Sequence, residues 1–240
     1  MKLTNNTILI TGGATGIGLG LTERFIHLGN KVIVCGRRKE VLAETKLRFP
    51  SIVTKEIDLA IESQRVELFE WIRENHGELN VLINNAGIQQ HLSVSDENFF
   101  GKAKQELVIN IEAPIHLTSL FLKLEKLDTI MNVTSGLSFI PMVKAPVYSA
   151  TKSFLHSFTL SLGKLLKARN IEVIEIIPPG LNTDLGGKGL HDQFPPVSEF
   201  ITAIFQQLEE GKTKLTFGMS AVSANASQAE LQAAFDRMNP

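Results

Sequence analysis

The chain carries the stretch Thr7-Ile-Leu-Ile-Thr-Gly-Gly-Ala-Thr-Gly-Ile-Gly18 close to its start. A short apolar run is followed by four glycines within seven residues, and then by apolar residues at helical spacing up to Gly29. This order predicts a strand, a glycine loop and a helix. Backbone N–H groups of such a loop can approach a diphosphate, and the positive end of the helix points toward it. We therefore predict a nucleotide site; a simple tight turn is the alternative.

The remaining chain repeats the alternation of strand and helix. The apolar runs are continuous, which is typical of parallel strands covered on both faces. We predict an α/β fold, a single doubly wound parallel (Rossmann-like) sheet of about seven strands with helices on both faces, in one domain over residues 1–240. The segment 181–196 is rich in Gly and Pro and is predicted to be a mobile substrate loop. The further strands are expected at 31–35, 51–58, 80–83, 128–133, 171–177 and 214–217, and the further helices at 40–49, 62–76, 102–126, 147–168, 197–210 and 227–238.

Four polar or glycine-containing stretches directly follow predicted strands. They are Gly12 to Gly18, Asn84 to Gly87, Thr134 to Ser135 and Pro178 to Thr183. Right-handed crossovers bring the carboxyl ends of parallel strands to one edge of the sheet, where ligands of such sheets bind. We expect the four stretches to lie together there.

Composition narrows the class of protein. The 240 residues are 43% hydrophobic and 20% charged, with a formal net charge of -1, so nothing favours nucleic acid or an anionic membrane as partner. The single cysteine, Cys35, suits a reducing compartment. No apolar run has signal-peptide or membrane-spanning length, and no histidine stands at a metal-ligand spacing. We expect a cytoplasmic protein with no membrane span and no metal.

The only tyrosine of the chain, Tyr148, stands four residues before Lys152. If a helix begins near Pro146, the phenol and the ammonium group lie one turn apart on the same face. Ser135 could add a hydroxyl to the same place. An exposed tyrosine beside a solvated lysine is the alternative.

Basic residues follow the second predicted strand, where NAD-binding sheets usually place a carboxylate for the ribose 2′-hydroxyl. Arg37, Arg38 and Lys39 precede the first acid, Glu40. Guanidinium groups suit a 2′-phosphate, so NADP(H) is favoured over NAD(H), with Arg37 the stronger candidate; a solvated helix start is the alternative. Asp58 is predicted either to bind an adenine amine or to cap a helix.

These motifs, in this order, resemble the short-chain dehydrogenase/reductase family over nearly the whole chain. The resemblance implies Asn110, Ser135, Tyr148 and Lys152 as catalytic residues, with Asn110 kinking its helix to hold a proton-relay water. It implies a cofactor site made by Gly12, Thr15, Gly16, Ile17, Arg37, Asp58, Leu59, Asn85, Ala86, Gly87, Tyr148, Lys152, Pro178, Leu181 and Thr183.

One turn departs from the family pattern. The usual Pro-Gly-x-Val-x-Thr is replaced by Pro178-Pro179-Gly180-Leu181-Asn182-Thr183, so the backbone beneath the nicotinamide is expected to run differently. Residues 182–187 resemble more narrowly a bacterial subgroup encoded with teichoic-acid D-alanylation genes.

The function predicted is hydride transfer between NADP(H) and a small carbonyl or alcohol substrate, with Tyr148 as general acid/base. A silent NADP(H)-binding regulator or scaffold and a non-redox epimerase or dehydratase are the alternatives. The helices at 102–126 and 147–168 carry apolar residues on more than one side, which indicates association or simple burial. The family resemblance implies a homodimer or homotetramer formed by pairing these two helices. Most of the candidate pocket residues are apolar, which favours an apolar carbonyl substrate. The candidates are Gln89, His91, Phe139, Met142, Leu185 and the segment 191–194.

Overall fold

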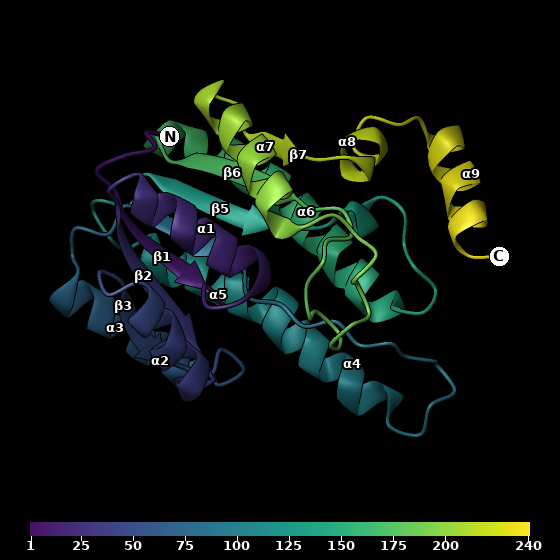
Figure 1. Cartoon of the computed structure of the whole chain (residues 1–240), viewed down its shortest axis with the longest axis horizontal. Helices are drawn as coiled ribbons and strands as arrows, with labels where there is room; N and C mark the ends of the chain where they lie inside the picture. Colours follow the sequence, from purple (N-terminus) through teal and green to yellow (C-terminus); the bar gives the residue numbers. More distant parts are fainter.

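Seven parallel strands form one sheet in the computed structural model, which describes residues 1–240 (Figure 1). Their order across the sheet is β3-β2-β1-β4-β5-β6-β7, and every neighbouring pair is parallel. The predicted fold class is therefore confirmed. The strands are β1 (Thr7–Thr11), β2 (Lys31–Gly36), β3 (Val53–Glu56), β4 (Val81–Asn84), β5 (Thr129–Val133), β6 (Glu172–Ile177) and β7 (Lys214–Thr216).

Helices cover both faces of this sheet. One hydrophobic cluster joins the sheet to α1, α2 and α7, and a second joins it to α3, α5 and α6. Figure 1 shows α1 and α7 side by side over the strands, while the C-terminal α8 and α9 lie beyond β7. The helices are α1 (Gly16–His27), α2 (Lys39–Arg48), α3 (Glu62–Asn75), α4 (Phe99–Leu107), α5 (Ala113–Phe121), α6 (Pro146–Leu166), α7 (Val197–Glu209), α8 (Met219–Ser223) and α9 (Gln228–Met238).

Successive residues of β1 enter different cores. Ile8 and Ile10 belong to the cluster beneath α1 and α7, whereas Leu9 belongs to the cluster on the opposite face. All three side chains are completely buried. A strand that alternates between two apolar layers needs apolar residues at every position, which explains the continuous runs in the sequence.

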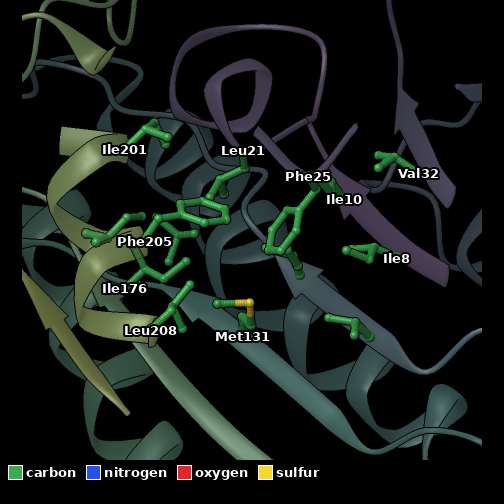
Figure 2. Close-up of a cluster of buried hydrophobic side chains, with 14 of the residues drawn as sticks. Ile8, Ile10, Leu21, Phe25, Val32, Met131, Ile176, Ile201, Phe205 and Leu208 are labelled. Carbon is green, nitrogen blue, oxygen red and sulfur yellow. The ribbon is translucent and has the colours of Figure 1, made fainter. Parts of the chain in front are cut away.

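Aromatic side chains join α1 to α7. Phe25 and Phe205 meet edge to face with their ring centroids 4.9 Å apart. Figure 2 shows both rings with Leu21 above the sheet, where Met131 of β5 lies beneath them. Edge-to-face pairs place the positive ring edge against the negative ring face, so the contact adds to the burial of apolar area.

The strand order reverses between β1 and β4, because β2 and β3 lie to one side of β1 while β4 to β7 lie to the other. The loops that leave β1 and β4 therefore diverge to opposite faces, and a crevice opens between them at the carboxyl edge. Ligands of open α/β sheets bind at such a point.

The long helix predicted over 102–126 is three pieces. A π-helical turn, Val108–Glu112, separates α4 from α5, and Pro114 lies in the first turn of α5. Ala113 donates its N–H to the carbonyl of Val108, five residues back. The helix is thus distorted at a widened turn, and Pro114, directly after that turn, leaves the Asn110 carbonyl without its α-helical N–H partner.

Replacing Phe205 by alanine is expected to lower the free energy of unfolding by about 3–5 kcal/mol, because it removes a buried ring and leaves a cavity beside Phe25. Chemical denaturation of the wild type and the variant measures the difference. Phe100→Ala is the matched control, since that ring is 76% exposed and its loss should leave stability within about 0.5 kcal/mol. Equal losses in the two variants would contradict the packing described.

Candidate active site

The glycine loop after β1 allows two backbone segments to approach closely. Gly12 and Gly16 have φ angles of +63° and +52°, a region that side chains disfavour. Gly18 has an ordinary φ, but a β-carbon there would lie 2.3 Å from the carbonyl oxygen of Gly12 and 2.5 Å from Nδ2 of Asn85. The loop thus exists in this form only with glycine at position 18, and it leaves the amino end of α1 open toward the crevice.

The loop after β4 is tied to the end of β1. Asn85 donates from Nδ2 to the carbonyl of Thr11 at 2.8 Å, and the Thr11 hydroxyl accepts the N–H groups of Asn85 and Ala86 at 3.0 Å each. Leu59 and Ala86 line a common small cavity of about 10 Å³ that also contacts Thr11. The structure thus brings these predicted cofactor residues together.

The four predicted catalytic side chains are buried. Relative exposures are 6% for Tyr148, 4% for Lys152, 8% for Ser135 and 1% for Asn110. Lys152 donates from Nζ to the carbonyl of Val133 at 2.8 Å, and Nζ lies 5.6 Å from the centroid of the Tyr148 ring. The alternative of an exposed tyrosine beside a solvated lysine is therefore wrong.

Burial opposes charge on both members of this pair. It lowers the pKa of Lys152 to about 8, and it raises the pKa of Tyr148 above its ordinary value. The neighbouring Ser135 hydroxyl lowers the pKa of Tyr148, although no hydrogen bond of standard geometry joins the two side chains, and the charge of Glu106 raises it further. In the protein alone, burial therefore favours the protonated phenol of Tyr148.

Asn110 lies in the π-helical turn and connects three segments. Its amide donates to the carbonyl of Ile88 at 2.9 Å and to the hydroxyl of Thr151 at 3.1 Å, while its oxygen accepts the N–H of Ile88 at 2.9 Å. Pro114 has no N–H to offer the Asn110 carbonyl, so the α-helical partner of that carbonyl is missing. The helix distortion attributed to Asn110 is thus present at this residue.

The altered turn after β6 makes room for an aromatic ring. A β-carbon on Gly180 would lie 2.9 Å from the ring of Phe194, so glycine allows that ring to cover the backbone. The Pro178 carbonyl accepts the N–H of Gly136 at 2.8 Å, which joins this turn to the one beginning at Ser135. Phe194 therefore packs directly on the backbone of this turn, which a glycine at position 180 allows.

Two predicted cofactor residues of this turn have different surroundings. Thr183 lies across from the glycine loop, since a β-carbon on Gly16 would be 3.4 Å from its methyl group. Leu181 is 3% exposed and belongs to the hydrophobic cluster beneath α1 and α7. Thr183 therefore faces the predicted diphosphate site, whereas Leu181 serves the core.

The basic segment after β2 is exposed. Arg38 donates from its guanidinium to the hydroxyl of Thr15 at 3.4 Å, whereas the exposed Arg37 has no hydrogen bond or ion pair from its side chain. The arginine ranked lower from the sequence is thus the one that reaches the glycine loop. Asp58 accepts the N–H of Ala60 at 2.9 Å, and α3 is capped by Ile61, so the prediction of Asp58 as a helix cap is wrong.

The predicted pocket residues differ in burial and in what they contact. Gln89 is buried and lies beneath the 181–196 loop, because a β-carbon on Gly186 would be 3.5 Å from its carbonyl. Phe139 packs edge to face on His156 with centroids 4.7 Å apart, whereas His91 is exposed. The 181–196 loop contains neither helix nor strand, apart from a bridge between Asn182 and Pro196.

One buried acid near the site was not predicted. Glu106 is completely buried on α4, and burial raises the pKa of its carboxyl to about 7. The signal in the sequence is its position, one helical turn before Asn110 on the same face. No cluster of three or more His, Cys, Asp or Glu side chains is arranged to hold a metal ion, and no helix is both long and apolar enough to cross a membrane.

Comparison with known proteins agrees with this geometry. Residues 6–193 match the family model described as short chain dehydrogenase. The chain belongs to the short-chain dehydrogenase/reductase family. The uncharacterized oxidoreductase DltE of Bacillus subtilis (strain 168) is 42% identical, with 100% of this chain and 98% of that protein covered. This relative confirms the narrower resemblance predicted from residues 182–187, and the chain is an NAD(P)-dependent oxidoreductase by family.

Solved members of the family share the whole fold. A short-chain dehydrogenase from Burkholderia cenocepacia J2315 in complex with NADP has a TM-score of 0.86 at 24% identity, with 99% of each chain covered. A short-chain dehydrogenase/reductase from Burkholderia phymatum in complex with NAD has a TM-score of 0.81 at 17% identity, with 100% of this chain and 97% of that chain covered. At these identities the likeness concerns the fold alone.

Gly18→Ala is expected to weaken cofactor binding and to lower the free energy of unfolding by about 1–3 kcal/mol or more. The reason is that the new methyl group would overlap the backbone of Gly12, which can shift only with the whole loop. Fluorescence titration with NADPH and thermal unfolding measure the two effects. Gly163→Ala in α6 is the control: its β-carbon would make an ordinary 3.7 Å contact with Val173, and loss of a helical glycine should stabilise by about 0.5–1 kcal/mol. Unchanged NADPH affinity in Gly18→Ala would contradict the site.

Proposed function

We propose that this protein transfers a hydride between NADP(H) and a carbonyl or alcohol carbon of a small, largely apolar substrate. The observation that carries the proposal is the buried pair Tyr148 and Lys152 beside Ser135, at the sheet edge that also holds the glycine loop. Burying a phenol and an ammonium group is costly, and buried titratable groups with shifted pKa values cluster at functional sites.

The residues around the crevice fit a dinucleotide. The amino end of α1 and the loop of Gly12 to Gly18 suit a diphosphate, because glycine leaves no β-carbon in the way. Leu59 and Ala86 would contact the adenosine side, Thr183 the diphosphate and Lys152 the nicotinamide side. When bound, the nicotinamide supplies the hydride acceptor or donor.

Tyr148 is proposed to give its phenolic proton to the substrate oxygen in reduction and to accept one in oxidation. Ser135 would donate a hydrogen bond to that oxygen, where negative charge develops. Positive charge is needed at this site, because burial raises the pKa of Tyr148. Lys152, with its pKa of about 8, carries that charge at neutral pH for most of the time.

NADP(H) is proposed over NAD(H) on the basis of the two arginines after β2. No carboxylate precedes Glu40 in this segment, and Arg38 already points to Thr15 of the glycine loop. A guanidinium can bind a 2′-phosphate through two parallel hydrogen bonds, which a 2′-hydroxyl cannot match.

A cytoplasmic homo-oligomer is proposed as well. Phe154, Leu160 and Leu165 of α6 remain 43%, 60% and 72% exposed, although Leu155 and Leu162 of the same helix are buried against the rest of the chain. Apolar side chains outside the core favour a second copy of the chain. The single buried Cys35, whose pKa burial raises to about 12, is suited to a reducing compartment.

Tyr148→Phe is expected to lower turnover by on the order of 10²–10⁴-fold, because it removes only the proton that the reaction moves. The measurement is NADPH consumption over a panel of aliphatic and aromatic ketones and aldehydes, with NADH run in parallel. NADPH affinity of the variant, followed by fluorescence, should stay near that of the wild type. Near wild-type turnover by Tyr148→Phe would overturn the assignment.

Arg38→Ala is expected to raise the KM for NADPH by on the order of tenfold, through loss of a charge-assisted hydrogen bond, with little effect on the KM for NADH. Arg37→Ala tests the other guanidinium in the same assay. Lys39→Ala, at the exposed first residue of α2, is the control and should change neither value more than about twofold. Equal effects on both coenzymes would count against recognition of a 2′-phosphate.

A further inference from the structure

The C-terminal helix α9 has few ties to the rest of the chain. None of its residues is buried, and Figure 1 shows it apart from the helices that cover the sheet. No hydrogen bond joins residues 228–238 to any residue before Ser227. The helix ends at its C-cap, Asn239, and this side chain does reach a distant part of the protein.

The amide of Asn239 binds the loop that precedes α6. Its oxygen Oδ1 accepts the N–H of Val143 at 2.9 Å, and its nitrogen Nδ2 donates to the carbonyl of Pro141 at 3.0 Å. Nδ2 also donates to the carbonyl of Phe235 at 3.0 Å, which fixes the amide on the end of α9. Both N–H groups and the oxygen of the amide are therefore used, and they join α9 to a loop 96 positions earlier in the chain.

The loop 139–145 separates the predicted catalytic residues Ser135 and Tyr148. It starts directly after a short 3-10 turn and ends at the N-cap of α6. Two of the predicted pocket residues, Phe139 and Met142, belong to it, and both are half-buried. A shift of this loop would therefore change the side of the crevice where a substrate is expected to lie.

Two other hydrogen bonds hold the loop from the crevice side. The hydroxyl of Ser149 on α6 accepts the N–H of Met142 at 3.1 Å. The carbonyl of Lys144 accepts the N–H of Leu92, in the segment after β4, at 3.0 Å. Asn239 supplies the hydrogen bonds from the opposite, C-terminal side.

The C-terminal segment also flanks the start of this stretch. A β-carbon on Gly136 would lie 3.4 Å from the β-carbon of Ser220 in α8, and Nζ of Lys214 lies 5.7 Å from the centroid of the Phe139 ring. The family model matches only residues 6–193, so the segment that supplies these contacts lies outside the matched pattern. Contacts of this kind can differ between members of a family without any change in the catalytic residues.

We propose that Asn239 is a positioning residue that holds the loop 139–145 and thereby shapes the substrate side of the crevice. The role rests on the proposed function, because it concerns how a carbonyl substrate fits beside Tyr148. Without Asn239, the Pro141 carbonyl and the Val143 N–H have no partner in the protein, and the loop is held only from the crevice side. Bulky substrates are then expected to lose affinity, whereas the proton-transfer groups, which Asn239 does not contact, keep their places.

Limited proteolysis of the full chain tests the position of the loop without a substrate. Trypsin can cut after the exposed Lys144 only when the loop opens, and the exposed Lys188 in the 181–196 loop provides an internal reference. Fragment masses give the initial rates of cleavage at the two sites. The proteins compared are the wild type, Asn239→Ala, Asn239→Asp and Asn225→Ala.

The substitutions separate the hydrogen bonds from other effects. Asn239→Asp keeps the size of the side chain and an acceptor for Val143, but it has no N–H for Pro141. Asn225→Ala is the matched control, because that exposed amide donates only to the carbonyl of Ala221, at 2.8 Å within the C-terminal segment.

The ratio of cleavage at Lys144 to cleavage at Lys188 is expected to rise on the order of tenfold in Asn239→Ala, through loss of two hydrogen bonds. It should rise in Asn239→Asp as well and stay at the wild-type value in Asn225→Ala. A wild-type ratio in either Asn239 variant overturns the proposal. A parallel rise at both lysines also overturns it, since overall stability and not the loop would then have changed.

Kinetics on the NADPH panel test the effect on substrate. In Asn239→Ala, KM for bulky aromatic ketones is expected to rise on the order of tenfold, with kcat and the KM for NADPH changed by less than about twofold. Unchanged KM for every ketone, or an equal loss of kcat for all of them, overturns the substrate role. Absence of turnover in the wild type would contradict the proposed function instead, and the cleavage ratio would then decide on Asn239 alone.

Discussion

The close approach of three backbone segments at the end of β1 is the constraint on which this structure depends. Gly18 leaves the space in which the Gly12 carbonyl and the Asn85 amide lie, and the Thr11 hydroxyl accepts two N–H groups of the loop after β4. This contact fixes where β1 and β4 separate. The crevice at that point then determines where a dinucleotide can enter and which strand ends can meet it.

Burial gives the active site its electrostatic character. Tyr148, Lys152 and Glu106 are all removed from water, and each pKa is shifted in the direction that opposes charge. A phenol with a raised pKa stays protonated in the protein alone and so has no free site to accept a proton. In the proposed reaction, positive charge from the cofactor and Lys152 would favour the phenolate that oxidation needs, whereas reduction would begin from the protonated phenol.

A row of polar side chains crosses the otherwise apolar sheet and supports this site. Asn84 and Asn132, paired across β4 and β5, are joined at 2.9 Å, and Asn132 donates to Thr159 of α6. On β6, Glu175 accepts from Thr134 at 2.7 Å and contacts His156 of α6 at 2.8 Å. Buried polar groups need partners with defined geometry, so this row fixes α6, and with it Tyr148 and Lys152, against the strands.

The sequence by itself determined the fold class, the glycine loop and the candidate catalytic residues, because continuous apolar runs, glycine spacing and the Tyr148–Lys152 interval are local patterns. Only the tertiary structure decided which residues contact one another across the fold. It showed that Arg38 reaches Thr15, that Phe194 covers Gly180 and that Leu181 belongs to the core. It also revealed the buried acid Glu106, because the burial of a helical side chain depends on the segments packed over it, which no local pattern contains.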